Sequence, residues 1–443
     1  MLAIACSNSP DIDSTLESDT PSSDALPGAD HHQETSHPSP DIAEAGDSEP
    51  QEADTPLPIS CEPCAPSTAS ATLSMPKQSF VTTPSRTRAN PLKGFMTSYL
   101  WSQPANDFPD QMEFLYLPMA DLWGADGERF DSGLEPHLNA AKARAHHAVL
   151  RIYLDYPTKA PGMPKHLTEV VDCQPYTDHG GGCSPDYDNP ALVEAMVGLL
   201  AELGLHYDGD PRIGAVQIGL LGFWGEWHTY PHADWFASSA TQKIILETAH
   251  NAFQTTQLQV RRPAMNTVEL RIGFHDDSFA YSTLGEIEWF FLPSLIAAGG
   301  EKRWQEVMIG GELRPELQST CFEDTYTLST YAQKVSTCIE NTHASYLLNY
   351  KAFNEANTGY LDKERENAES AALLLGYQFE AHAAELKLWG LQNGSVEAQV
   401  EVVVAQTGVA PFYYDLTATL HSPASGLIAS SAEPLHTVLP GQT

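Results

Sequence analysis

The chain has 443 residues and a formal net charge of −35, because 58 acidic residues outnumber 23 lysines and arginines. A charge of this size repels nucleic acid and anionic lipid headgroups, so we expect a neutral or cationic partner and no nucleic acid. No run reaches the roughly 18 apolar residues of a membrane helix, so the sequence predicts no membrane-spanning helix.

The first 87 residues differ in composition from the rest. The opening Leu2-Ala3-Ile4-Ala5-Cys6 resembles the end of a bacterial lipoprotein signal, in which the cysteine takes a lipid, so we interpret residues 1–6 as the remnant of such a signal. Residues 7–87 are rich in Ser, Pro, Asp, Glu and Ala, which predicts a disordered acidic linker. We therefore expect an exported protein that is secreted, or is held to the periplasmic or surface face of the cell envelope by a lipid on Cys6.

Six of the seven cysteines form three close pairs in the sequence. If Cys6 takes a lipid, the other six allow three disulfides, which require an oxidising compartment outside the cytoplasm. The pairs are Cys61 with Cys64, Cys173 with Cys183, and Cys321 with Cys338. Two alternatives stay open. All six can be reduced thiols, or the first pair can have a redox or zinc role, although no second CxxC accompanies it.

Short apolar runs alternate with helical patterns over residues 88–376, which indicates βαβ units and a parallel sheet. Eight strands are predicted: Pro91 to Met96, Met112 to Pro118, Ala148 to Tyr156, Gly214 to Gly222, Gln257 to Met265, Ser278 to Tyr281 with the preceding loop, Glu306 to Gly311, and Ala344 to Tyr350. Helices are predicted at Leu134 to His146, Pro190 to Leu205, Ala240 to Phe253, Leu284 to Ala298, Leu328 to Glu340, and Lys363 to Leu375. Since no GxGxxG loop is present, this order predicts a (β/α)8 barrel, the TIM fold, rather than an open doubly wound sheet.

The hydrophobic period changes to two in residues 377–443, which predicts a small antiparallel, β-sandwich-like domain that is minimal or truncated. Its expected strands are Glu385 to Trp389, Val396 to Ala405, Tyr413 to Leu420, and Gly426 to Ser430.

Two glutamates follow predicted strands at the end of the barrel where barrel enzymes carry their catalytic groups. Glu226 comes after the fourth strand, between Trp224 and Trp227, and Glu312 comes after the seventh, close to Arg314. Cleavage of a glycosidic bond requires two facing carboxyl groups, one to protonate the departing oxygen and one to stabilise or attack the sugar cation. Apolar walls raise the pKa of an acid, and a nearby cation keeps a carboxylate ionised, so each environment assigns a role.

The two glutamates resemble the arrangement of clan A retaining glycoside hydrolases. The resemblance implies that Glu226 is the acid/base, that Glu312 is the nucleophile, and that the anomeric configuration is retained. A carboxyl separation of about 5 to 5.5 Å predicts retention, and one of roughly 6.5 to 9.5 Å predicts inversion. One position departs from the clan, because Gly225 stands where many of those enzymes have the Asn that binds the sugar 2-hydroxyl.

Residues 88–443 also resemble a bacterial family that is catalogued as a domain of unknown function. Its members look like a glycosidase-type barrel followed by a β domain, without an established activity. The motifs that carry this resemblance are Asn90-Pro91-Leu92-Lys93-Gly94-Phe95, Leu150-Arg151-Ile152-Tyr153-Leu154-Asp155-Tyr156-Pro157, Gly219-Leu220-Leu221-Gly222-Phe223-Trp224-Gly225-Glu226-Trp227-His228, and His275-Asp276-Asp277-Ser278-Phe279.

Polar residues at other strand ends are further candidates for substrate contact. Arg151 and Asp155 lie on one face of the third strand, so we expect an interior ion pair near the site or direct contact with substrate. His228 follows Glu226 closely enough to share the substrate.

Strands six and eight supply the remaining polar candidates. His275, Asp276 and Asp277 can bind sugar hydroxyls or, alternatively, a divalent metal, but no second cluster with ligand spacing accompanies them. Asn349 and Tyr350 close strand eight, where they can orient the carboxylate of strand seven. We expect no metal and no cofactor.

Aromatic residues and one long loop are expected to line the substrate cleft. Trp123, Trp224, Trp227 and Trp235 lie near predicted strand ends, and we expect two of them to stack on sugar rings. Residues 158–189 form a loop that is long for this fold and contains the second cysteine pair, so we interpret it as an active-site flap.

The preferred hypothesis is a monomeric glycoside hydrolase that acts on a neutral poly- or oligosaccharide. Two alternatives remain open at this point. The barrel can be a carbohydrate-binding surface lipoprotein that needs neither glutamate, since fold does not imply function. It can also be a metal-dependent hydrolase that uses His275, Asp276, Asp277 and His228.

Overall fold

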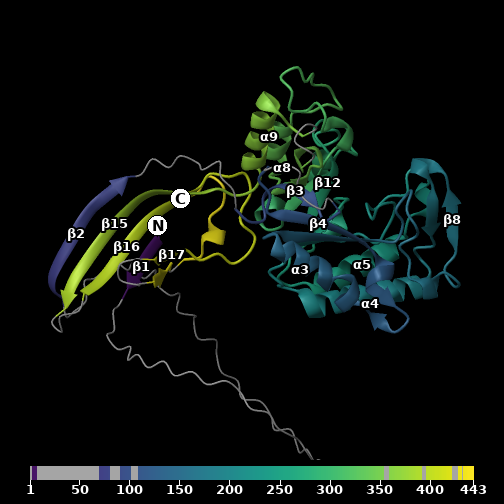
Figure 1. Ribbon diagram of the computed structural model, residues 1–443, viewed down its shortest axis with the longest axis horizontal. Coiled ribbons are helices and arrows are strands. Elements are labelled where there is room, and N and C mark those ends of the chain that lie inside the picture. The colour runs from purple at the N-terminus through teal and green to yellow at the C-terminus, as the bar shows by residue number, and fades with distance from the viewer. Residues whose placement is uncertain are drawn as a thin grey trace, which may run out of the picture.

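The computed structural model describes residues 2–6, 69–79, 90–100, 108–353, 359–391, 396–421, 428–431 and 433–443. Figure 1 shows a barrel ringed by helices and, beside it, a curved antiparallel sheet. In the part of the chain that is described, no helix has both the length and the apolar character needed to cross a bilayer.

Eight parallel strands close the barrel in the order β10-β11-β12-β13-β14-β3-β4-β7. Their bounds are β3 Gly94–Ser98, β4 Met112–Pro118, β7 His147–Tyr153, β10 Ile213–Gln217, β11 Leu258–Val260, β12 Gly273–Phe279, β13 Ile309–Leu313 and β14 Tyr346–Leu348. Each overlaps one predicted strand, so the predicted (β/α)8 barrel is confirmed. Most of the strand residues are buried, as expected for parallel strands with a packed interior and helices outside.

Helices cover the outside of the barrel. The α-helices are α1 Met119–Leu122, α2 Phe130–Gly133, α3 Glu135–Ala143, α4 Pro190–Tyr207, α5 Ser239–Ala252, α6 Met265–Val268, α7 Phe291–Ala297, α8 Val335–Thr342 and α9 Asp362–Leu374. Short 3-10 helices are η1 Lys165–Leu167, η2 Asp178–Gly180, η3 Ala233–Trp235, η4 Arg303–Gln305, η5 Pro315–Leu317, η6 Lys351–Phe353 and η7 Leu435–Thr437. The start of α4 follows from its sequence, because Asn189 accepts a hydrogen bond from the Ala191 N–H at 3.0 Å and Pro190 holds the first helical position.

Several predicted elements differ from the observed ones. The predicted helix Leu328 to Glu340 begins only at Val335, as α8, and of the predicted strand Tyr413 to Leu420 only the end is a strand, β17 Thr419–His421. Strand β12 begins at Gly273 and includes His275 to Asp277, which the prediction placed in a loop because polar residues interrupt the apolar pattern. Helix α7 begins at Phe291 rather than at residue 284, because Gly285 has a φ of +128° and the Phe291 N–H bonds the Ser282 carbonyl instead of a helical partner.

An aromatic loop of the C-terminal domain closes the amino end of the barrel. Phe412, Tyr413 and Tyr414 pack against a buried cluster that includes Met112, Val149 and Ala215, and Met308. The Tyr414 hydroxyl donates to the Gly214 carbonyl at 2.7 Å and accepts from the Gln257 N–H at 3.0 Å. These contacts join the aromatic loop to the starts of β10 and β11 at the amino end of the barrel.

The C-terminal domain is antiparallel, as predicted. Its four-stranded sheet has the order β1-β16-β15-β2, and a separate pair joins β17 and β18. The bounds are β1 Leu2–Cys6, β2 Ala69–Ser79, β15 Phe379–Leu391, β16 Val396–Gln406, β17 Thr419–His421 and β18 Ile428–Ser430. Smaller pairs elsewhere are β5 Trp123–Gly124 with β6 Gly127–Glu128, and β8 Cys173–Tyr176 with β9 Gly182–Pro185.

The prediction of one continuous linker over residues 7–87 is wrong in its last third, where residues 69–79 form β2 along the open edge of β15. The composition does not predict this strand, because pairing along the edge of β15 uses backbone groups, which every residue type except proline supplies in full. The register shifts between Met75 and Gln78, around Pro76, which has no N–H to donate. Residues 2–6 form strand β1 against β16, and lipid attachment at Cys6 stays a prediction.

The cysteine pairs have different outcomes. Cys173 and Cys183 form a disulfide that joins β8 to β9, as predicted. Cys321 and Cys338 are free and buried, so the predicted disulfide between them is wrong. Both thiols belong to one apolar cluster, where cysteine packs as a small hydrophobic residue. Cys61 and Cys64 lie outside the described residues.

Candidate active site

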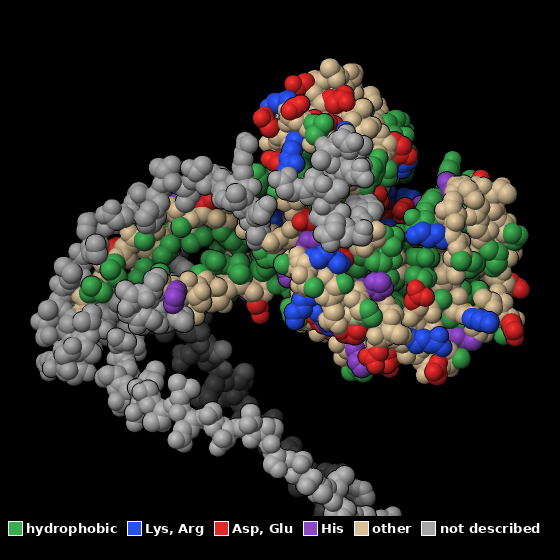
Figure 2. Space-filling view, viewed as in Figure 1, with side chains coloured by type: hydrophobic (Ala, Val, Ile, Leu, Met, Phe, Trp, Pro, Cys, Tyr) green, Lys and Arg blue, Asp and Glu red, His purple; other side chains and the backbone are tan. Residues whose placement is uncertain are grey.

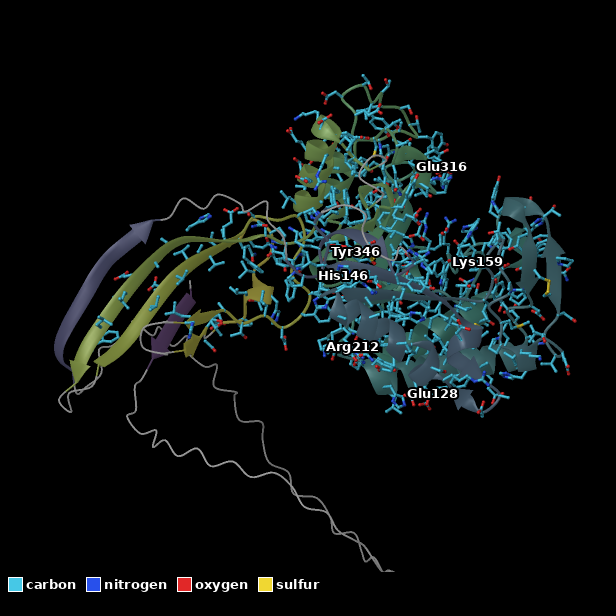
Figure 3. All side chains as sticks on the ribbon, in the orientation of Figure 1. Glu128, His146, Lys159, Arg212, Glu316 and Tyr346 are labelled. Atoms are coloured by element: carbon cyan, nitrogen blue, oxygen red, sulfur yellow. A yellow bond between two sulfur atoms is a disulfide. The ribbon has the colours of Figure 1, made fainter. Side chains whose placement is uncertain are left out.

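A cavity of about 580 Å³ lies at the carboxyl end of the barrel and contains both predicted catalytic glutamates. Figure 2 shows charged side chains in the hollow between the lobe that carries α8 and α9 and the lobe that carries β8. The lining residues are Ser98, Leu100, Phe114, Tyr116, Arg151, Tyr156, Lys159, His179, Trp224, Glu226, Asp277, Glu312, Arg314, Pro315, Glu316 and Leu348. Lys159 and Glu316 lie on opposite sides of this hollow (Figure 3).

The loop after β10 positions Glu226 by folding back on itself. The Phe223 N–H bonds the His228 carbonyl at 2.8 Å, and the Glu226 N–H bonds the Phe223 carbonyl at 2.9 Å. Gly225 allows this reversal, because its φ is +64° and a Cβ there would lie 3.0 Å from the Gly219 Cα. The loop geometry thus explains why Gly stands where the clan A pattern has Asn.

Strand β13 carries Glu312 to the opposite wall of the cavity. Gly311, just before it, has a φ of +155°, and a Cβ there would lie only 2.1 Å from the Asp276 carbonyl oxygen. Glycine therefore lets β13 approach β12 closely enough to aim the next side chain into the cavity. The Glu312 side chain is partly exposed there, and among the described residues it makes no hydrogen bond or ion pair.

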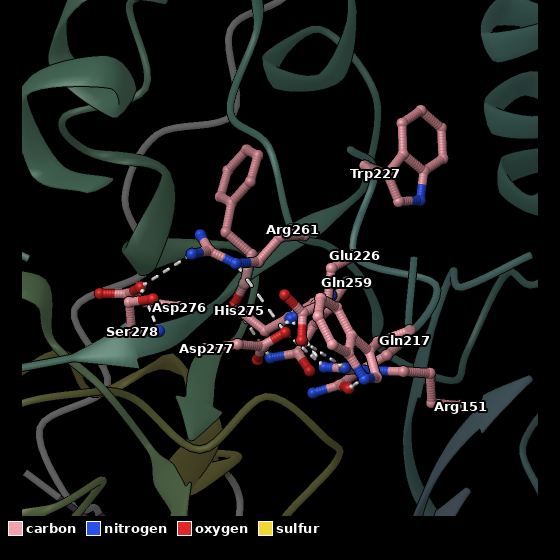
Figure 4. A network of polar contacts seen from close by, with 12 residues as sticks. Arg151, Gln217, Glu226, Trp227, Gln259, Arg261, His275, Asp276, Asp277 and Ser278 are labelled. Carbon is pink, nitrogen blue, oxygen red and sulfur yellow. Dashed lines mark hydrogen bonds and ion pairs between the residues drawn. The ribbon is translucent and has the colours of Figure 1, made fainter. Parts of the chain in front are cut away.

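Arg151 is the central cation of the site (Figure 4). Its Nη2 lies 2.8 Å from Asp277 Oδ2, and its Nε donates to Gln217 Oε1 at 2.7 Å. Its Nη1 lies 3.8 Å from Glu226 Oε1. The predicted ion pair between Arg151 and Asp155 is wrong, because Asp155 instead accepts from the Tyr176 hydroxyl at 2.7 Å.

The acidic run of β12 is occupied by protein cations. Asp277 bonds Arg151 and lies 3.8 Å from Arg261 Nε, and Asp276 Oδ1 lies 3.5 Å from Arg261 Nη2. Although burial acts in the opposite direction, Arg151 and the groups around it lower the pKa of Asp277. Burial lowers the pKa of His275 to about 4, so this imidazole is neutral.

Glu312 has the most perturbed environment of the pocket carboxyls. Burial, together with the negative charges of Asp277 and Glu226, raises the pKa of Glu312 to about 8, although Arg151 and Arg314 act in the opposite direction. Arg314 is already paired, since its Nε donates to Glu316 Oε2 at 2.6 Å. Arg314 acts in the expected direction on Glu312, but burial and the two neighbouring acids outweigh it, so the pKa of Glu312 is raised rather than lowered.

Six of the predicted site residues meet at the cavity: Arg151, Trp224, Glu226, Asp277, Glu312 and Arg314. Trp227 does not, because its indole is buried and donates to the Ile218 carbonyl at 2.6 Å, pointing away from the cluster in Figure 4. His228 does not line the cavity either, but it contacts the glutamate, with its Nε2 3.4 Å from Glu226 Oε2.

The other predicted polar residues lie in the packing around the cavity. Asp155, His275 and Asp276 are buried, and none of them lines it. Asn349 accepts hydrogen bonds from the Ala352 N–H and the Tyr360 hydroxyl, and the Tyr350 hydroxyl bonds the Pro315 carbonyl at 3.4 Å. The expectation that these last two residues orient the strand-seven carboxylate has no support in these contacts.

One of the four candidate tryptophans lines the cavity, rather than two. It is Trp224. Trp123 packs against Gly198 of α4, and Trp235 stacks on His232 with ring centroids 3.7 Å apart. The predicted flap does reach the site, because His179 from residues 158–189 lines the cavity and its Nε2 lies 3.0 Å from the Tyr230 carbonyl oxygen.

Sequence reasoning missed the tyrosine wall of the cavity. Tyr116 and Tyr156 line it beside Lys159, whose Nζ lies 3.8 Å from the centre of the Tyr156 ring. A signal was present for Tyr116, which alternates with Phe114 along β4 and lies near the carboxyl end of that strand. No pattern marked Lys159.

Among the described residues, no group of three or more His, Cys, Asp and Glu side chains has an arrangement that could hold a metal ion. The run from His275 to Asp277, which raised that alternative, faces the guanidinium groups of Arg151 and Arg261 instead. These positive charges disfavour a cation at the same place.

No family model matches the chain, and no curated protein matches it. Solved structures with a similar fold include endo-glycoceramidase II from Rhodococcus sp. in a cellobiose-like imidazole complex, at 11% identity and a TM-score of 0.40, with 77% of this chain and 93% of that chain covered. The exo-β-1,4-mannosidase from Opitutaceae bacterium strain TAV5 has 10% identity and a TM-score of 0.39, covering 63% of this chain and 59% of that one. A Pseudomonas stutzeri endoglucanase has 9% identity and a TM-score of 0.34, covering 59% and 81%. The barrel itself is established by the strand order of this chain.

Proposed function

We propose that this chain is a glycoside hydrolase that cleaves a neutral carbohydrate with Glu226 and Glu312. The observation that carries the proposal is the meeting of two carboxyl groups, from the loop after β10 and from β13, in one cavity of about 580 Å³. The two groups differ in surroundings, because one lies beside an arginine and the other has a raised pKa. Such a difference separates an acid from an ionised partner.

The environments assign the roles in the reverse of the order implied by the clan A resemblance. Glu312 carries the proton at neutral pH and would donate it to the departing glycosidic oxygen. Glu226, with Arg151 Nη1 at 3.8 Å as its counter-charge, would face the developing positive charge of the sugar. Retention of the anomeric configuration stays a prediction, and proton NMR of the first product anomer measures it.

The walls of the cavity support a neutral sugar as substrate. With Glu312 protonated, the remaining acids Glu226, Asp277 and Glu316 face three bases, Arg151, Lys159 and Arg314. Tyr116, Tyr156 and Trp224 line the cavity with aromatic rings on which a pyranose can stack.

We also propose that the protein works outside the cytoplasm, with a lipid on Cys6 as its anchor. The disulfide between Cys173 and Cys183 supports an oxidising compartment. Labelling of the natural precursor with a radioactive fatty acid tests the anchor, and a Cys6→Ser variant that still takes label would contradict it.

Turnover of aryl glycosides, screened over several sugars and both anomers, tests the proposed activity. The wild type should hydrolyse at least one of them. On the phenyl glycoside of that sugar, whose leaving group needs a proton, Glu226→Gln and Glu312→Gln should each lose roughly 10²- to 10⁴-fold in turnover while still binding the sugar. Glu113→Gln, a buried glutamate outside the cavity, is the matched control and should keep its turnover per folded molecule. Sugar binding without turnover in the wild type would favour the non-catalytic alternative, and loss of activity with a chelator would favour the metal-dependent one.

A further inference from the structure

Three exposed or partly exposed aromatic residues form a strip beside the cavity: Tyr281, Trp289 and Tyr331. Tyr281 follows β12, Trp289 precedes α7, and Tyr331 precedes α8, so all three belong to loops at the carboxyl end of the barrel. Trp289 is 53% exposed and Tyr331 is 39% exposed. The catalytic proposal uses none of these residues.

The strip is continuous with the cavity. Arg314 lines the cavity, and its guanidinium lies over the Tyr281 ring at 4.9 Å from the ring centre. Tyr281 contacts Tyr331 with ring centroids 4.9 Å apart, and Tyr331 lies 6.5 Å from Trp289 with ring planes within 25° of parallel. Through Tyr281, the exposed and nearly parallel rings of Tyr331 and Trp289 are therefore connected to the wall of the cavity.

The protein holds these rings in place from below. Phe290 is fully buried and contacts Trp289 at 4.7 Å and Tyr331 at 5.6 Å between ring centroids. Gln333 joins the two loops, since its Nε2 donates to the Leu284 carbonyl at 2.7 Å and its Oε1 accepts from the Leu284 N–H at 2.9 Å. A surface fixed in this way loses little side-chain freedom when a ligand binds.

Large aromatic side chains are costly to leave in water, and a contiguous patch of them marks a binding surface. Their faces stack on the apolar faces of sugar rings, while the hydroxyls of the sugar stay in water. Because the strip continues the wall of the cavity, the ligand that suits it is a further part of the carbohydrate held there.

We propose that the strip of Tyr281, Trp289 and Tyr331 binds additional sugar units of a neutral glycan chain whose cleaved bond lies in the cavity. This inference rests on the proposed function and makes it more specific: the substrate is a chain of several sugar units rather than a single sugar attached to a small group.

Affinity electrophoresis tests the binding directly and needs no catalysis. Wild type, Trp289→Ala, Tyr331→Ala and the control Leu205→Ala are run in native gels that contain hydroxyethylcellulose, galactomannan or arabinoxylan. Leu205 is 77% exposed on α4, so its removal matches the loss of exposed apolar area at a different place. We expect at least one polysaccharide to retard the wild type and the control, and each strip variant to bind about tenfold more weakly, since one aromatic anchor contributes a little over 1 kcal/mol.

A kinetic comparison separates failure of the strip from failure of the active site. On the retarding polysaccharide, kcat/KM of both strip variants should fall about tenfold, whereas kcat/KM on an aryl monoglycoside should stay within twofold of the wild type (about 0.4 kcal/mol). Equal retardation of variants and wild type, or no retardation of the wild type by any of the three polymers, would overturn the strip proposal. Retardation that depends on the strip, without hydrolysis of any glycoside, would uphold the strip and reject the proposed enzyme.

Discussion

Two glutamates near opposite ends of the barrel have opposite surroundings. At the amino end, both carboxylate oxygens of Glu113 are bonded: Arg144 contacts both oxygens, and His146 Nδ1 lies 3.0 Å from Oε2. Although burial acts in the opposite direction, His146 and Arg144 lower the pKa of Glu113. At the carboxyl end, Glu312 makes no such bond among the described residues, and its pKa is raised to about 8.

The comparison separates a carboxylate that is paired within the protein from one that is proposed to react. Glu113 is compensated by fixed partners within the protein, so removing it should change stability. Glu312 lies against other anions in the cavity, and its raised pKa suits the proposed role of proton donor. The two ends of one barrel thus place the same residue type in different electrostatic surroundings.

The largest predicted effect is on stability at the amino end. Glu113→Gln leaves Arg144 without its carboxylate partner and leaves His146 with Asp110 alone, whose Oδ2 lies 3.2 Å from His146 Nε2. We expect a loss of about 2 to 3 kcal/mol in the free energy of unfolding, measured by urea titration at pH 7. The value is below that of a fully buried pair because the Arg144 side chain is 33% exposed.

Glu312→Gln should behave in the opposite way in the same titration. Between the ordinary carboxyl pKa of 4.5 and about 8, the folded chain holds a proton that the unfolded chain releases, so the stability of the wild type falls as the pH rises through this window. The variant lacks this loss and should be more stable than the wild type at pH 9. A wild type that gains stability relative to the variant over that window would contradict the assignment.

The second predicted effect is on the pH dependence of turnover. If Glu312 is the acid, kcat/KM should fall about tenfold per pH unit above a pH of about 8, because the proton is lost there. The measurement is initial-rate kinetics on an aryl glycoside from pH 5 to pH 10. A kcat/KM that stays constant up to pH 10 would show that the reaction does not depend on the proton of Glu312.

The smallest predicted effect concerns the aromatic loop that closes the barrel. Tyr414→Phe removes the hydroxyl that joins Gly214 to Gln257, and we expect a loss of about 1 kcal/mol in the free energy of unfolding. Turnover should not change, because this contact lies at the end of the barrel opposite the cavity. A change in kcat without a change in stability would show that the two ends are coupled.

Much of the frame could be predicted from the sequence. The eight strands, the two glutamates and the flap follow from local patterns, because a strand end and a long loop are visible within short windows of sequence. The meeting of Glu226 and Glu312 then follows from the topology, since the carboxyl ends of parallel strands share one edge.

The partners of these groups could not be predicted in the same way. Arg151 pairs with Asp277 across the barrel rather than with Asp155 on its own strand end, and that choice depends on tertiary packing. Trp227 points into the core because the loop reverses at Gly225, and a residue count along the chain cannot show this reversal.

The leaving-group dependence of the two glutamine variants tests the central claim most directly. Dinitrophenolate is a good leaving group and departs without being protonated, whereas the phenol of a phenyl glycoside needs a proton to depart. Rates of Glu312→Gln and Glu226→Gln are therefore measured on both substrates of the sugar that the wild type accepts. We predict that Glu312→Gln keeps much of its kcat/KM on the dinitrophenyl substrate and loses kcat/KM on the phenyl substrate. Glu226→Gln should lose kcat/KM on both substrates. The reverse pattern would return the acid role to Glu226, and full rates in both variants would remove the pair from catalysis.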